Sequence, residues 1–109
     1  MMNMFGKVKE IQAKLQKAKE NLVNITAEGE SGGGMVKAIV NGHFKLLKIE
    51  IDHSLVKPEE IDMLQDLTVA AVNKAMEAVA EKSKEEMKKA TDGVLPNIPG
   101  LDLNSLFGA

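Results

Sequence analysis

The side chains that could bind a metal ion are few, because the sequence has two histidines and no cysteine. His43 follows a predicted turn, and His53 follows the strand expected over residues 43–52. An extended strand rises about 3.3 Å per residue, so the two imidazoles would lie roughly 30 Å apart. Since a metal site needs converging ligands, we expect no metal centre and no bound cofactor.

A glycine-rich stretch, Ser31-Gly32-Gly33-Gly34, has the glycine content of a phosphate-binding loop but not its context. No Lys-Ser or Lys-Thr pair follows it, and it precedes a predicted strand instead of a helix N-terminus. We interpret it as a turn with positive φ angles. No Ser/His/Asp set has supporting context either, so we expect neither enzymatic activity nor a small-molecule substrate.

Lysine is the remaining side chain that could bind a charged ligand, and every one of the 14 basic residues is a lysine. The net charge is −2, but residues 1–23 carry five lysines against two glutamates, which gives +3. Lysine suits phosphate oxygens and cannot read guanine as the arginine fork does. Phosphate contacts give affinity for double-stranded DNA without sequence information and with strong salt dependence. The candidate DNA-binding residues are Lys7, Lys9, Lys14, Lys17, Lys19, Lys82, Lys84, Lys88 and Lys89.

Three alternatives remain open at this point. The lysines also fit the solvated face of an ordinary amphipathic helix, which is the usual meaning of a charge run. A coiled-coil chaperone or protein-binding scaffold of prefoldin-like design is the main rival function, and seven methionines would suit it. Its apolar stripe would reach the helix tips, whereas the second stripe here fades after Val79. A regulatory partner of a recombination or replication protein is the third.

The elements that must position the lysines begin with a helix. Apolar residues recur at spacings of four and three, which predicts an amphipathic helix with a narrow seam suited to one partner helix. We expect Asn3 to cap its N-terminus. The stripe consists of Met4, Val8, Ile11, Leu15, Ala18 and Leu22.

Three strands are predicted over residues 24–30, 35–40 and 43–52. Asn41-Gly42 predicts a two-residue type I′ hairpin that would pair Val40 with His43. Both faces of the resulting sheet are partly apolar, and one chain can cover only one face well, so the second face is expected to contact another subunit. The expected dimer contacts are Met35, Ile39, Phe44 and Leu46 of the sheet and Leu67 and Ala71 of the second helix.

A second helix is predicted from Pro58 to about Ala90, with its first half on the sheet and its second half in solvent. The predicted fold is therefore α+β, with an N-terminal helix, a three-stranded antiparallel meander and a long C-terminal helix. Residues 1–90 form one domain. Residues 91–109 are expected to form a flexible Gly/Pro/Leu tail, whose Leu101, Leu103, Leu106 and Phe107 could dock on an apolar surface.

The chain resembles the YbaB/EbfC family of bacterial nucleoid-associated proteins over essentially its whole length. The resemblance is carried by Gly34-Met35-Val36-Lys37, by Asn41-Gly42 with the later Ile49-Glu50-Ile51-Asp52, and by residues 66–73, DLTVAAVN. It implies a tweezers-like homodimer that binds DNA with weak or variable sequence preference and has no enzymatic activity. Many members carry arginine, so the resemblance does not extend to arginine-based base recognition.

The expected location is the cytoplasm, at the nucleoid. The N-terminus lacks the apolar segment of a secretory signal, because lysines recur from Lys7 onward. No apolar run approaches the roughly 20 residues that span a bilayer, so no membrane partner is expected.

Overall fold

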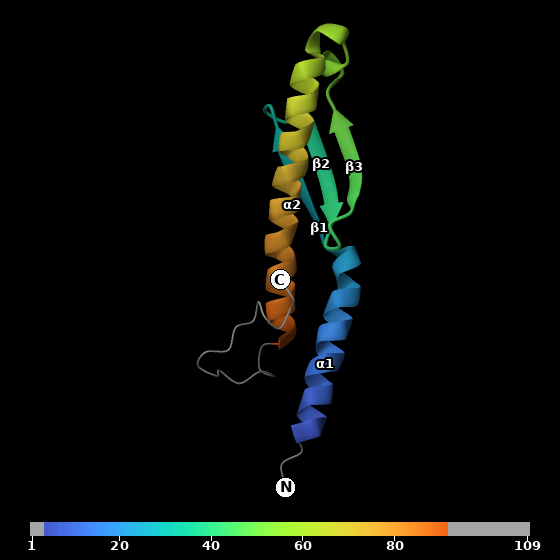
Figure 1. Cartoon of the computed structure of the whole chain (residues 1–109), viewed down its shortest axis with the longest axis vertical. Coiled ribbons are helices and arrows are strands. Elements are labelled where there is room, and N and C mark those ends of the chain that lie inside the picture. Colours follow the sequence, from blue (N-terminus) through green and yellow to red (C-terminus); the bar gives the residue numbers. More distant parts are fainter. Residues whose placement is uncertain (1–3, 92–109) are drawn as a thin grey trace.

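The computed structural model describes residues 4–91, and the predicted cap Asn3 and most of the predicted tail, 92–109, lie outside that range. Helix α1 (Met4–Asn21) leads through a 3-10 turn, Leu22–Asn24, into strands β1 (Thr26–Ser31), β2 (Val36–Asn41) and β3 (Leu46–Ile51). Two short 3-10 turns follow, and helix α2 (Ile61–Thr91) completes the chain. Figure 1 shows this order, and it confirms the predicted helix, three-stranded sheet and long helix.

The sheet is antiparallel in the order β1-β2-β3, and α2 packs on one face of it against β1 and β2. The period of two in β1 and β2 brings small and branched apolar side chains to that face, where they meet a helical stripe of the same kind. No aromatic side chain of the described residues belongs to this core. Its fully or nearly fully buried members are Ala27, Val36, Ala38, Val40, Leu55, Ala71, Ala75 and Val79.

Gly29 of β1 sets how closely helix and sheet approach. A Cβ atom at this position would lie 2.3 Å from the backbone oxygen of Ala71 and 2.3 Å from the backbone nitrogen of Ala75. The helix backbone therefore occupies the space that any side chain would need. Two alanines on α2 and a glycine on β1 allow the two backbones to touch, which explains how so thin a core excludes water.

The predicted two-residue hairpin after Val40 is wrong. Val40 pairs with Leu46 and Ile39 pairs with Lys48, with an irregularity between them, so the connection is longer than predicted. Positive φ occurs at Phe44, not at Gly42. The cause is a long-range contact: the backbone N–H of Gly42 donates to the carbonyls of Leu22 (3.0 Å) and Ile25 (2.9 Å), which ties the turn to the end of α1.

This change of register leaves each side chain on the face of the sheet that was predicted for it. Lys37 pairs with Glu50, whereas a two-residue hairpin that pairs Val40 with His43 would place Lys37 opposite Leu46, so the register differs by four residues. Because side chains alternate with a period of two, an even shift keeps each one on the same face. Ile49 and Ile51 therefore still lie on the face of Ala38 and Val36, their partners across the strands.

Helix α1 extends away from the sheet and lies beside only the last part of α2, as Figure 1 shows. Its far half continues past the end of α2. The molecule is therefore elongated, with the sheet at one end and α1 projecting from the other. Within residues 4–91, no helix is long and apolar enough to cross a membrane.

Candidate nucleic-acid interface

All five lysines predicted on the first helix lie on α1, spread around a helix that is mostly exposed. Lys14 forms an ion pair with Glu10 at 3.8 Å, one helical turn away. Among the described residues, the other four lysines of α1 form no ion pair. Those four are Lys7, Lys9, Lys17 and Lys19.

The four lysines predicted on the second helix lie in the last three turns of α2, but their surroundings differ. Lys82 donates a hydrogen bond to the backbone carbonyl of Thr26, at the start of β1. Lys89 pairs with Glu86 at 3.8 Å. Lys84 is exposed and forms no ion pair with any residue in 4–91. Lys84 is therefore more available than Lys82 or Lys89 for an external phosphate.

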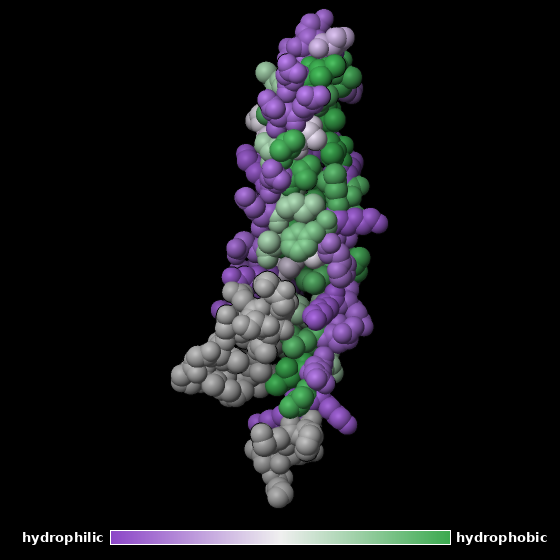
Figure 2. Space-filling view, viewed as in Figure 1, coloured by the Kyte–Doolittle hydropathy of each residue, from purple (hydrophilic) through white to green (hydrophobic). Residues whose placement is uncertain are grey.

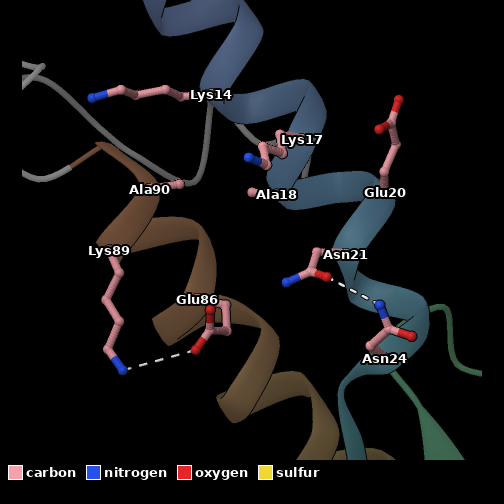
Figure 3. A pocket seen from close by; sticks show the side chains of 9 residues that line it. All are labelled: Lys14, Lys17, Ala18, Glu20, Asn21, Asn24, Glu86, Lys89 and Ala90. Carbon is pink, nitrogen blue, oxygen red and sulfur yellow. Dashed lines mark hydrogen bonds and ion pairs between the residues drawn. The ribbon is translucent and has the colours of Figure 1, made fainter.

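An open cleft separates the end of α2 from the second half of α1. It is lined by three lysines of the predicted set, Lys14, Lys17 and Lys89, together with Glu20 and Glu86. Figure 3 shows Lys14 and Lys17 reaching from α1 toward the end of α2, while Glu20 points away from it. The fold thus brings together basic groups that lie more than 70 residues apart in the sequence.

Charge is separated along the molecule. We call α1 with residues 81–91 of α2 the arm, and residues 22–80 the body. The arm has nine lysines, all of them predicted DNA contacts, against five glutamates, which gives +4. The body has five lysines against nine acidic residues, which gives −4. The arm is therefore the positively charged part of the described chain and the body the negatively charged part, although the whole chain is acidic.

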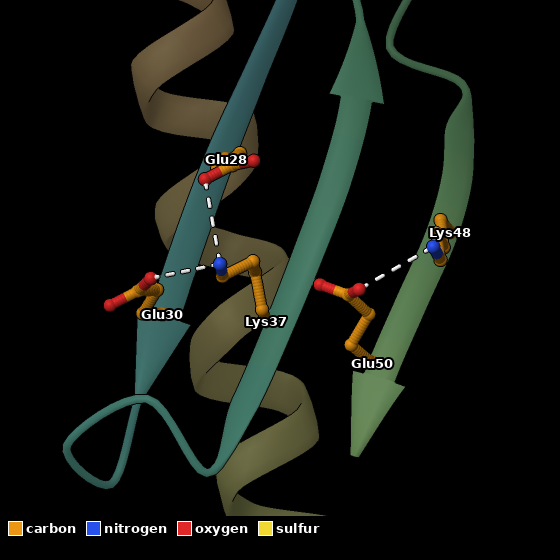
Figure 4. A network of polar contacts seen from close by, with 5 residues as sticks. All are labelled: Glu28, Glu30, Lys37, Lys48 and Glu50. Atoms are coloured by element: carbon orange, nitrogen blue, oxygen red, sulfur yellow. Dashed lines mark ion pairs between the residues drawn. The ribbon is translucent and has the colours of Figure 1, made fainter.

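The face of the sheet opposite α2 is charged. Lys37 of β2 lies 4.0 Å from Glu28 and 3.5 Å from Glu30 of β1, and Lys48 lies 3.4 Å from Glu50 on β3, as Figure 4 shows. The charges of Glu28, Glu30 and Glu50, together with a hydrogen bond to Glu30, raise the pKa of Lys37. Such a face is a poor subunit contact, because burying it would strip water from five charged groups.

Exposed apolar side chains gather instead around β3, which α2 leaves largely uncovered. Leu47 is 48 % exposed and Ile51 37 %, and neither was among the expected dimer contacts. Figure 2 shows a strip of hydrophobic surface along the side of the molecule where β3 and the adjoining flank of α2 lie. The sequence does not show which strand a helix leaves bare, so no local pattern could have identified this strip.

The structure sorts the predicted dimer contacts into three groups. Phe44 and Leu46 are exposed, whereas Met35, Ile39 and Leu67 are half-buried. Ala71 has no exposed surface, because it packs beneath Gly29 inside the same chain. Ala71 is therefore removed from the predicted subunit contact.

The described residues do not form the arrangement of a metal site or of a phosphate-binding loop. Within residues 4–91, no three His, Asp or Glu side chains gather as they would around a metal ion. Gly32, Gly33 and Gly34 all have positive φ, which confirms the interpretation of this stretch as a turn between strands.

Known proteins that are similar to this chain point to a single family. The YbaB/EbfC DNA-binding family matches residues 1–94. A nucleoid-associated protein of Syntrophobacter fumaroxidans is 43 % identical over 105 residues, covering 96 % of this chain and 94 % of the relative. A second nucleoid-associated protein, from Chlorobaculum parvum, is 45 % identical over 106 residues, covering 97 % and 91 %.

A solved structure has the same fold. The crystal structure of the uncharacterized protein HP0035 from Helicobacter pylori superposes with a TM-score of 0.67 at 26 % identity, covering 82 % of this chain and 97 % of that one. The family and the names of the relatives indicate a DNA-binding protein and not an enzyme. The chain belongs to the YbaB/EbfC family of nucleoid-associated DNA-binding proteins.

Proposed function

We propose that the arm binds double-stranded DNA through contacts between its lysines and phosphates, with little sequence specificity. The separation of charge, +4 on the arm and −4 on the body, is the observation that carries this proposal. The 18 residues of α1 span about 27 Å at 1.5 Å per residue, comparable to eight base-pair steps of 3.4 Å. The helix is thus long enough to follow a groove edge and contact several phosphates.

The same arm lacks the groups that read bases. The chain has no arginine for bidentate guanine contacts, and Phe5 is the only aromatic residue in the arm. Contacts made by lysine alone fix position without reading sequence.

We also propose that the protein acts at the nucleoid in the cytoplasm. Many bound copies would change DNA conformation there and so influence nucleoid organisation, gene expression and DNA protection. Membership of a DNA-binding family favours this function over the prefoldin-like alternative.

We further propose that the protein is a homodimer with the apolar strip at β3 as its contact. β3 is an edge strand on which Leu47 and Ile51 are exposed, and Ile51 faces the α2 side of the sheet. A second copy that places its own strip there would bury both edges, and a self-complementary patch of this kind is what a two-fold dimer uses. Two arms would then project from one dimer core, as the tweezers-like arrangement requires.

The DNA proposal is tested by fluorescence anisotropy with labelled duplexes of unrelated sequence at several salt concentrations. We expect similar affinity for all duplexes and a linear fall of log K with log salt. The variant Lys7→Glu/Lys14→Glu/Lys17→Glu should bind all duplexes more weakly, and its salt slope should drop by about 3 per chain if all three lysines contact phosphate.

The control carries the same change of charge on the body, as Lys45→Glu/Lys57→Glu/Lys74→Glu. It should bind better than the arm variant, because its substitutions lie on the part already repelled by DNA. Equal losses in the two triple variants would contradict the assignment of binding to the arm. Affinity that ignores salt would contradict phosphate contacts altogether.

Sedimentation equilibrium tests the dimer. The wild type should sediment as a dimer at micromolar concentration, and Ile51→Lys should sediment as a monomer, since it places a charge in the apolar strip. The neighbouring control, Glu50→Lys, alters the charged outer face and should remain dimeric. A monomeric wild type, or two variants that dimerise equally, would refute the contact at β3.

A further inference from the structure

The apolar stripe of α1 is only partly covered by the other described elements of this chain. Val8 is 49 % exposed, and Ile11 and Leu15 are only half-buried, although all three belong to the stripe that the sequence pattern predicts to be buried. The end of α2 reaches the level of Lys14 and Ala18, where Ala90 lines the same cleft. Beyond that level no other element of residues 4–91 lies beside α1, as Figure 1 shows.

The surroundings of this stripe define what would cover it. Lys7 and Lys14 lie along one flank of the stripe and Lys19 along the other, because each is three or four residues from a stripe position. Figure 2 shows apolar surface on α1 bordered by hydrophilic side chains. A suitable occupant is therefore apolar along one side and carries negative charge.

Residues 92–109 have that chemistry. The segment holds seven apolar residues of medium or large size, two aspartates, Asp92 and Asp102, and no lysine. It follows Thr91, the last residue of α2, and therefore begins beside the cleft where α1 and α2 meet. Twelve residues can span up to about 40 Å when extended, whereas Val8 lies about 15 Å along α1 from Ala18, so Leu103 is within reach.

We propose that residues 92–109 lie along the exposed apolar stripe of α1 in the same chain and compete with DNA for the lysines of the arm. The leucines and Phe107 cover the stripe, while Asp92 and Asp102 face lysines beside it. DNA must displace this acidic segment to reach α1. The segment thereby lowers the affinity for DNA and raises the DNA concentration that is needed for binding.

Cysteine crosslinking tests the contact without using DNA. The natural chain has no cysteine, so the pair Val8→Cys/Leu103→Cys introduces the only two thiols. We expect a disulfide within one chain, identified by mass spectrometry of the denatured monomer. The control Lys48→Cys/Leu103→Cys, with its first thiol on the outer sheet face, should not form one.

Two outcomes would overturn the proposed contact. The first is the absence of any bond between positions 8 and 103. The second is a bond that joins two copies through the thiol introduced at position 8, because it would show that a partner's α1 covers the stripe.

The competition has a separate readout, which rests on the proposed DNA binding. The full-length variant Asp92→Asn/Asp102→Asn should bind duplex DNA about two- to tenfold more tightly than the wild type, the range expected for losing two exposed charge pairs. A chain ending at Thr91 should gain at least as much. Unchanged affinity in both variants would overturn the competition. Failure of every version to bind DNA would instead refute the proposed function, while the crosslink would still report on the contact.

Discussion

The side-chain nitrogen of Lys82 lies 2.6 Å from the backbone carbonyl oxygen of Thr26 and donates a hydrogen bond to it. This bond joins the last third of α2 to the start of β1, at the edge of the sheet. It also separates Lys82 from Lys84, two lysines that the sequence places in the same basic cluster. One stabilises the fold locally, and the other is available to a ligand.

This difference predicts unequal effects on DNA binding. Lys84→Ala should weaken binding and reduce the magnitude of the salt slope by about 0.9, the value for one lost phosphate contact. Lys82→Ala should leave the slope nearly unchanged and lower the free energy of unfolding by about 1 kcal/mol, since its main partner is Thr26. Anisotropy titrations at several salt concentrations measure the first effect, and urea denaturation measures the second. The reverse pattern would show that Lys82 leaves the sheet to contact DNA.

Gly29→Ala should destabilise the fold strongly, because the added methyl group would meet the backbone of Ala71 and Ala75. Helix α2 must move away from β1, which costs about 3 kcal/mol or more by the usual scale of overpacked cores. Gly33→Ala is the matched control, since no atom lies within 4 Å of its Cβ position. Its φ of 67° still strains an alanine by about 1 kcal/mol. Thermal or urea unfolding should rank Gly29→Ala far below Gly33→Ala.

Asn41 is expected to be essential for the turn between β2 and β3. Its side-chain oxygen accepts hydrogen bonds from the backbone N–H groups of His43 (2.9 Å) and Lys45 (3.1 Å), and the residue is nearly fully buried. Asn41→Ala removes both bonds and should cost about 2 kcal/mol. Asn24→Ala, which removes an exposed bond to Asn21, should cost less than about 1 kcal/mol. Similar unfolding midpoints for the two variants would contradict the role of Asn41.

Asp52 should contribute to stability in a way that depends on acid pH. Hydrogen bonds from Ser54, chiefly from its backbone N–H at 2.9 Å, stabilise the carboxylate and lower the pKa of Asp52. Because the folded pKa lies below the unfolded value, the stabilisation is complete above about pH 5 and is lost as pH falls through the lowered pKa. Asp52→Asn keeps an acceptor oxygen but does not titrate. The stability of the wild type should therefore fall toward that of Asp52→Asn between about pH 5 and about pH 2, and a constant difference would refute the linkage.

Much of the fold could be predicted from local patterns. The stripe from Val8 to Leu22 predicted α1 to within one residue of its observed end, because helical periodicity is a property of consecutive residues. All nine lysines predicted to bind DNA lie on α1 and α2, the two helices that local periodicity predicted. The hairpin was predicted wrongly, since the preference of Asn41-Gly42 for a tight turn is weaker than the hydrogen bonds that Gly42 makes with Leu22 and Ile25.

The sequence by itself determined which elements form, which face of each strand is apolar, and that the positive charge lies on helices, because all of these depend on neighbours in the chain. Tertiary structure alone decided that α2 covers β1 and β2 but leaves β3 bare, and that Lys89 comes beside Lys14 while Lys82 turns to Thr26. These outcomes depend on how closely Gly29 lets one backbone approach another and on where two distant helices meet. Packing between distant segments is a property of the whole folded chain, and no window of consecutive residues contains it.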